Sequence, residues 1–169
     1  MPAPHAPNLL LLLAALLPTA LACHLPRALP ARGLHLLRTM APNSTCQQQL
    51  PPFFPDAFPH NRHPQHPQHS ALAILSNLLH TLSSNRIPQQ WDNPARDDLL
   101  NTLDQHTQRL QQCLKDNSML LTLNVNRYFR RIHSFLNANN HSDCAWHHVY
   151  LEARLCFQHL HNLTSTTHN

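Results

Sequence analysis

Residues 142–163 read SDCAWHHVYLEARLCFQHLHNL, and this stretch decides the fold class. Its apolar side chains recur in steps of three and four residues, which places them on one face of an α-helix. Ser142 is expected to cap the N-terminus of this helix, and Asp143 lies in the first turn, where negative charge is favourable. The apolar stripe is suited to packing between other helices and consists of Trp146, Val149, Ala153, Cys156, Leu160 and Leu163.

Three segments upstream carry the same kind of pattern. Residues 70–82 and 120–137 each place leucines or aromatic side chains on one helical face. A third helix is expected over residues 93–114, with Asn93 as N-cap and Pro94 at the first helical position. No stretch alternates cleanly between apolar and polar residues, so the sequence predicts an all-α protein.

Proline placement sets the connections between these helices. A fifth helical pattern, in residues 25–40, is interrupted by Pro26, Pro30 and Gly33, so we expect a helix only in its second half. Residues 42–68 are rich in proline and predict a long crossover without helix. Such a crossover lets consecutive helices run parallel, which favours an up-up-down-down bundle of five helices.

Composition excludes several functional classes. The 169 residues include 1 glycine, so the chain cannot build a P-loop, a dinucleotide-binding turn or a nucleophile elbow. The net charge is +4, but the arginines are scattered and form no nucleic-acid-binding motif. No motif fixes a catalytic triad, and a Cys–His hydrolase centred on Cys156 is disfavoured because that thiol lies on the apolar stripe. We therefore expect neither an enzyme nor a nucleic-acid-binding protein.

The N-terminus has the features of a secretory signal peptide. Residues 9–17 are an unbroken Leu/Ala run, too short to span a bilayer, and Ala20 and Ala22 form an A-x-A cleavage signature. We expect residues 1–22 to be removed and residues 23–169 to form one secreted domain without membrane insertion. Sequons at Asn43, Asn140 and Asn162 agree with secretion and are candidate glycosylation sites.

Secretion implies that the 5 cysteines pair where geometry allows. Cys144 and Cys156 are separated by about 18 Å along one helix, too far for a disulfide. Cys156 is expected to remain a free core thiol. The other four cysteines, Cys23, Cys46, Cys113 and Cys144, allow three pairings, and the spacing does not choose between them.

The order of these helices and cysteines resembles that of type I interferons. Residues 144–149 (CAWHHV) resemble the start of the family's last helix, and residues 127–132 (RYFRRI) resemble the preceding helix. The abundance of histidine and the mature N-terminal sequence Cys-His-Leu are most similar to the avian branch. Trp91 and residues 99–100 and 110–113 resemble the family's third helix, and residues 36–40 resemble its first helix. The match therefore covers essentially all of the mature chain.

The resemblance implies a fold and a function. It implies two disulfides, Cys23–Cys113 and Cys46–Cys144, within a helical cytokine bundle. It also implies a secreted antiviral cytokine that acts as a monomer, bridges the two chains of the type I interferon receptor and triggers JAK–STAT signalling. Bridging two receptors requires no catalytic residue, cofactor or metal.

The resemblance also places two receptor-binding faces. The main face is expected on the first helix, the crossover and the last helix, where the matching positions are Tyr150, Leu151, Arg154, Leu155 and Gln158. The weaker face is expected to use Asn126, Arg127, Arg130 and Arg131. The alternatives are that the leucines are buried at the flank of the bundle and that the arginines form an ordinary solvated face. Residues 47–51 lack the arginine that many mammalian members carry after the second cysteine, so the crossover departs from the family pattern.

Two other functions compete with this interpretation. The chain could be a helical cytokine for a different receptor pair. It could instead be a secreted metal-binding protein, because histidines recur every three residues among prolines and would share one face of a polyproline helix. The spacing is unlike that of closed zinc sites, so we favour a polar loop without a metal. The histidines in question are His60, His63, His66 and His69.

Overall fold

The computed structural model describes residues 23–41, 46, 67–114 and 119–166. Within these ranges the chain forms five helices and no strand. The helices are α2 (Ala28–Met40), α3 (Pro67–Leu82), α4 (Asn93–Cys113), α5 (Met119–Ala138) and α6 (Asp143–Thr166).

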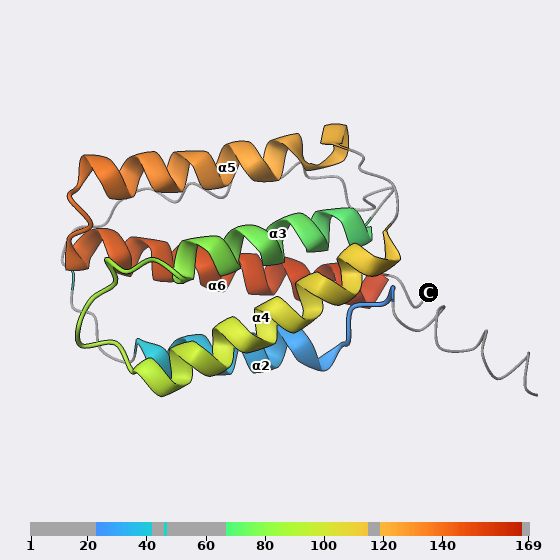
Figure 1. The fold of residues 1–169 in the computed structure, drawn as a ribbon, viewed down its shortest axis with the longest axis horizontal. Helices are drawn as coiled ribbons and strands as arrows, with labels where there is room; N and C mark the ends of the chain where they lie inside the picture. Colours follow the sequence, from blue (N-terminus) through green and yellow to red (C-terminus); the bar gives the residue numbers. More distant parts are fainter. Residues whose placement is uncertain (1–22, 42–45, 47–66, 115–118, 167–169) are drawn as a thin grey trace, which may run out of the picture.

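Four of the five expected helices form the up-up-down-down bundle, and α5 lies outside these four (Figure 1). Helices α2 and α3 run in one direction, and α4 and α6 run in the opposite direction. Helix α5 is parallel to α3 and lies on the outside of the bundle, against α3 and α6. Helix α2 contacts α4 and α6, and α3 also contacts α4 and α6. The parallel course of α2 and α3 agrees with a long crossover, of which residues 42–45 and 47–66 lie outside the described part of the chain.

The apolar stripe of the last helix forms the centre of the core, as predicted. Trp146, Cys156 and Leu160 are fully buried, and the other members of the stripe are at most 4% exposed. The Ser142 hydroxyl accepts a hydrogen bond from the Ala145 amide at 3.3 Å, which confirms Ser142 as the N-cap of α6. On α5, Tyr128 and Phe129 are also buried and Phe135 is partly buried, so both C-terminal helices turn their predicted apolar faces to the core.

The start of the first helix was predicted wrongly. Helix α2 begins at Ala28 and includes Pro30 and Gly33, where we expected the helix to be interrupted. Pro30 is tolerated because it lies in the first turn, where a backbone amide has no partner within the helix. Gly33 lies inside the helix because the Phe157 ring of α6 packs against it so closely that a side chain would not fit.

Two other helix starts also differ from the expectation. Helix α3 begins at Pro67, three residues before the predicted start, because proline is well suited to an N-terminal position. The N-cap of α4 is Asp92 and not Asn93, since the Asp92 carboxylate accepts a hydrogen bond from the Ala95 amide at 2.8 Å. The backbone amide of Asp92 also donates to the Met40 carbonyl at 2.9 Å, so contact with the end of α2 fixes this start.

Replacing Gly33 by alanine should destabilise the protein, although alanine has a higher helix propensity than glycine. A Cβ at this position would lie 2.6 Å from Cζ and 2.8 Å from Cδ1 of the buried Phe157 ring. We expect Gly33→Ala to lower the free energy of unfolding by about 1–3 kcal/mol, because the core is overpacked. Urea denaturation followed by circular dichroism measures this change. The matched control is Ala31→Gly at an exposed position of α2, which should cost about 1 kcal/mol. A stabilised Gly33→Ala variant would show that the two helices do not approach so closely.

The loop between α3 and α4 is fastened to the start of α6. The indole Nε1 of Trp146 donates to the Arg86 carbonyl at 2.6 Å, and the Trp146 ring meets the Trp91 ring edge-on at 5.5 Å. The Arg96 guanidinium donates to the carbonyls of Leu82 and Ser84, each at 3.0 Å, and so satisfies the C-terminal end of α3. This end of the bundle is therefore held by buried aromatic packing and by directed hydrogen bonds.

Candidate functional site

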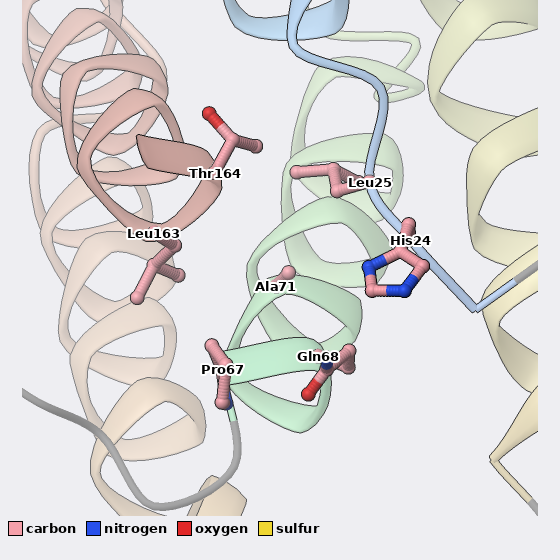
Figure 2. Close-up of a pocket in the computed structure, with 7 residues that line it drawn as sticks. All are labelled: His24, Leu25, Pro67, Gln68, Ala71, Leu163 and Thr164. Carbon is pink, nitrogen blue, oxygen red and sulfur yellow. The ribbon is translucent and has the colours of Figure 1, made fainter. Parts of the chain in front are cut away.

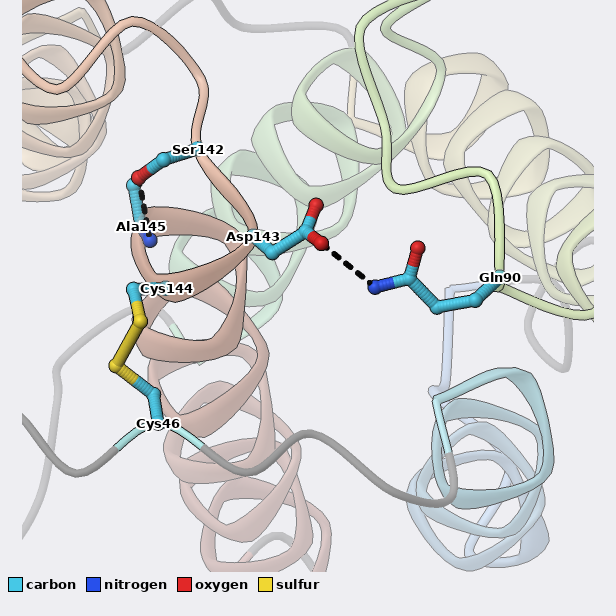
Figure 3. The surroundings of a disulfide bond; sticks show 6 residues. All are labelled: Cys46, Gln90, Ser142, Asp143, Cys144 and Ala145. Atoms are coloured by element: carbon cyan, nitrogen blue, oxygen red, sulfur yellow. Dashed lines mark hydrogen bonds between the residues drawn. A yellow bond between two sulfur atoms is a disulfide. The ribbon is translucent and has the colours of Figure 1, made fainter.

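The disulfides tie the N-terminal segment and the crossover to helix ends. Cys23 pairs with Cys113 at the end of α4, and Cys46 pairs with Cys144 in the first turn of α6 (Figure 3). The Cα–Cα distances are 5.4 and 5.3 Å, within the range that a disulfide requires. Of the three pairings that the sequence left open, the structure contains the one that the family resemblance implied. Beside the second disulfide, the Gln90 side chain donates to the Asp143 carboxylate at 3.0 Å.

The fifth cysteine is buried in the core and is not disulfide-bonded. Its sulfur lies 3.7 Å from the Tyr128 hydroxyl. Burial raises the pKa of the Cys156 thiol to about 12, so the thiol stays protonated and unreactive at physiological pH. This environment is the opposite of what a cysteine nucleophile requires.

A buried polar cluster joins α5 to α6, and the sequence did not predict it. The Tyr128 hydroxyl donates to the Glu152 carboxylate at 2.7 Å, and His148 Nε2 lies 3.6 Å from the same carboxylate. Glu152 is only 1% exposed. Burial is also the main reason why the pKa of His148 is lowered and the pKa of Tyr128 is raised. The cluster lies in the core, where it can hold two helices together but cannot reach a partner.

The predicted face on α6 combines apolar and charged groups at the surface. Leu151 is 37% exposed, Gln158 is exposed, and Arg154 and Leu155 are half-buried. The Arg154 guanidinium lies over the Tyr150 ring, 5.8 Å from the ring centroid. Tyr150 is 9% exposed, so its ring supports the guanidinium from below and offers little surface of its own.

The predicted face on α5 is strongly basic. Arg127, Arg130 and Arg131 are all exposed. Asn126 differs from them because its side chain accepts a hydrogen bond from Asn77 of α3 at 3.0 Å and is therefore engaged within the bundle. Leu123 on the same helix is 43% exposed, and no sequence pattern had marked it as a surface residue of interest.

Two cavities open near the ends of the bundle. The first lies where the N-terminal segment, the start of α3 and the end of α6 meet, among residues such as His24, Pro67 and Leu163 (Figure 2). Its volume of about 10 Å³ is close to the space that one water molecule needs. The second has a volume of about 300 Å³ and lies at the α3–α5 seam, where His80 and His133 face each other with ring centroids 5.1 Å apart.

The second cavity holds one imidazole in a defined hydrogen bond. The Thr81 hydroxyl donates to the Asn77 carbonyl at 2.7 Å, so it accepts from His133 Nε2 at 2.9 Å. Burial, together with the neighbouring His80 and His141, lowers the pKa of His133. This imidazole is therefore neutral at pH 7.4.

The remaining predicted features lie partly outside the described residues. His60, His63 and His66 are outside them, and His69 lies in the first turn of α3. Asn43 is also outside them, whereas Asn140 and Asn162 are exposed. In the described ranges, no three or more potential ligand side chains are arranged to hold a metal ion. None of the helices in these ranges is both long enough and apolar enough to cross a membrane.

Comparison with known proteins shows the family of this chain. Residues 25–167 match the family model described as interferon alpha/beta domain. The chain is 37% identical to interferon type A1/A2 of Gallus gallus, with 94% of this chain and 90% of that protein covered. It is 34% identical to an interferon of Meleagris gallopavo, with 94% and 91% covered.

A solved structure supports the architecture independently. Zebrafish interferon 1 superposes with a TM-score of 0.67 at 18% sequence identity, covering 82% of this chain and 94% of that one. At this identity the likeness shows the fold alone, whereas the family model and the two bird relatives show the family. The chain belongs to the alpha/beta (type I) interferon family, in its avian-like part, and is a cytokine and not an enzyme.

Proposed function

We propose that this chain is secreted after removal of residues 1–22 and acts as a monomer that bridges the two chains of the type I interferon receptor. Bridging would bring the receptors' cytoplasmic kinases together, start JAK–STAT signalling and establish an antiviral state. The observation that carries the proposal is the exposed part of α6 around Leu151 and Arg154, where the family resemblance implies the main receptor face. Asn43, Asn140 and Asn162 are the proposed glycosylation sites.

The α6 face has the chemistry of an interface hot spot. Leu151 and Leu155 are one turn apart and form an apolar ridge beside the Arg154 guanidinium. The Tyr150 ring beneath Arg154 limits the conformations of this side chain, which lowers the entropy lost on binding. Burying such a ridge with a preoriented arginine is the kind of contact that dominates binding energy.

The α5 face would serve the second receptor chain. Arg127, Arg130 and Arg131 are exposed and could pair with carboxylates of a receptor. Exposed pairs of this kind contribute more to the rate and selectivity of association than to affinity. We therefore propose a main contact through α6 and a weaker, electrostatic contact through α5.

A cell assay tests the function directly. Purified protein added to avian cells that carry the type I interferon receptor should produce STAT phosphorylation within minutes. Cells from which one receptor chain has been deleted should not respond. An equal response in those cells would show that the protein is a helical cytokine for a different receptor pair.

A paired substitution tests the α6 face. We expect Arg154→Ala combined with Leu155→Ala to weaken binding to one purified receptor ectodomain by about 10- to 100-fold, because two adjacent hot-spot contacts are lost. Surface plasmon resonance measures the affinity, and thermal unfolding shows whether the variant remains folded. The control is Asn101→Ala, an exposed position of α4, which should leave the affinity unchanged. If the paired variant binds both ectodomains as wild type does, α6 is not the main face.

A further inference from the structure

The outer face of α5 carries an arginine cluster with no internal counter-charge. Arg127, Arg130 and Arg131 are spaced so that they share one side of the helix over little more than one turn. Within the described residues none of these three side chains forms an ion pair or a hydrogen bond. Three unpaired guanidinium groups this close together create a local positive potential that favours an anionic partner.

The surroundings of the cluster strengthen this potential. Neither α3 nor α5 contains an aspartate or a glutamate. The other layer of the bundle differs, because α2 carries two arginines and no carboxylate but packs against α4, which carries three carboxylates. Those carboxylates belong to Asp97, Asp98 and Asp104 of α4. The α3–α5 face is therefore positive where the three arginines lie, whereas the α2–α4 face is mixed.

The cavity at the α3–α5 seam extends this surface. It is lined by His80 from α3, His133 from α5 and His141 from the turn before α6, and no carboxylate lines it. Nδ1 of His141 is buried and makes no hydrogen bond within the described part of the chain. Arg130 lies one turn before His133 along α5, so the cluster continues into the cavity. From Arg127 to Asn137 this surface runs about 15 Å along the helix.

We propose that this α3–α5 face binds a sulfated polysaccharide of the cell surface or extracellular matrix. An extended chain of sulfates could follow the arginines along α5 and place one sulfate or hydroxyl group in the histidine-lined cavity. The choice of an extracellular partner rests on the proposed secretion, but the binding itself does not depend on receptor recognition. The polysaccharide would concentrate the protein where it is released, and it would compete for the α5 face with the second receptor chain.

Two features favour a polysaccharide over other polyanions. Proteins that bind single-stranded nucleic acids stack bases on exposed aromatic side chains, and the only large apolar side chain exposed on the described part of α5 is Leu123. A helix that lies on an anionic membrane carries an apolar stripe next to its basic one. In residues 122–138 of α5, Leu123 is the one large apolar side chain that is exposed, and one side chain does not make a stripe. The face therefore offers charge and hydrogen bonding without stacking or insertion.

The experiment compares binding of a heparin-derived oligosaccharide by three forms of the full mature protein. Wild type should bind with an affinity that falls as salt increases, because bound counterions are released. The variant Arg127→Gln/Arg130→Gln/Arg131→Gln should bind at least about ten-fold more weakly, because three ionic contacts are lost. The matched control, Arg32→Gln/Arg38→Gln/Arg109→Gln, removes the same charge from exposed positions of α2 and α4 and should bind within about two-fold of wild type.

Three results would overturn the proposal. Equal weakening of both triple variants would mean that net charge, and not the α5 face, governs binding. Binding to duplex DNA or to phosphatidylserine vesicles as tightly as to the oligosaccharide would mean that the face recognises a different polyanion. Failure of wild type to bind the sulfated oligosaccharide more tightly than its desulfated form would exclude a sulfate site. The readout is polysaccharide binding, so it stays informative even if the protein proves to use another receptor.

A pH series tests the part played by the cavity. Burial and the neighbouring His80 and His141 lower the pKa of His133, and a bound sulfate would favour its protonated form. Affinity for the oligosaccharide should therefore rise as the pH falls from 7.5 to 5.5 in wild type and rise less in His133→Gln. An affinity that does not change with pH would remove the cavity from the proposed site.

Discussion

Replacing Cys23 and Cys113 together by serine is expected to lower the free energy of unfolding by about 4–5 kcal/mol. This disulfide joins residues 90 apart in sequence, and closing so long a loop removes much entropy from the unfolded chain. A domain of this size has a total stability of about 5–15 kcal/mol, so the variant should be only marginally folded at 37 °C. Urea denaturation under non-reducing conditions measures the difference.

Two controls separate the cross-link from the loss of a thiol. Cys156→Ala removes a buried thiol that forms no disulfide and should cost only about 1 kcal/mol. The Cys46–Cys144 bridge spans 98 residues, and its removal should cost about as much as removal of the first bridge. A loss below about 1 kcal/mol for Cys23→Ser/Cys113→Ser would show that this bridge does not form in solution.

Trp146→Ala is expected to lower the free energy of unfolding by about 3–5 kcal/mol. Trp146 is fully buried, and its ring packs on Trp91 at the end of the bundle where the loop before α4 meets α6. Its removal leaves a cavity and also deprives the Arg86 carbonyl of its hydrogen-bond donor. Urea denaturation followed by circular dichroism is the suitable measurement, because the substitution itself changes the tryptophan fluorescence.

The matched variant Trp146→Phe separates these two effects. Phenylalanine keeps most of the packing but cannot donate to the Arg86 carbonyl, so the expected loss is about 1–3 kcal/mol. If Trp146→Ala and Trp146→Phe prove equally destabilising, the hydrogen bond and not the buried volume dominates at this position. If neither substitution changes the free energy of unfolding, Trp146 does not pack on Trp91 or bond to the Arg86 carbonyl in solution.

The helices could be predicted from the sequence where one apolar stripe determines one buried face. The six stripe residues of the last helix need only a single periodic pattern, and all six are buried. The disulfide pairing required the family resemblance, because spacing alone excluded only a bridge between Cys144 and Cys156. The two outward faces were also placed by resemblance, and the structure adds that Asn126 and Tyr150 are engaged within the bundle.

Features that depend on contacts between distant segments were beyond the sequence. Asp92 and Asn93 are both good N-caps, and the carbonyl of Met40, far away in sequence, decides between them. Gly33 lies within a helix because of a ring on α6 that no local pattern reveals. Glu152 lies off the apolar stripe and reads as a surface residue until its partner Tyr128, 24 positions away, is known.

The buried bond between Tyr128 and Glu152 also restricts how α5 and α6 can align. Two helices that meet through leucines and other aliphatic side chains can slide past each other by one turn with little loss, because one apolar contact replaces another. A slip of α5 by one turn would move the Tyr128 hydroxyl by about 5 Å and break its hydrogen bond to the buried Glu152 side chain. This one hydrogen bond therefore selects a single register for the outer helix, and it fixes where the arginines of α5 stand relative to the rest of the molecule.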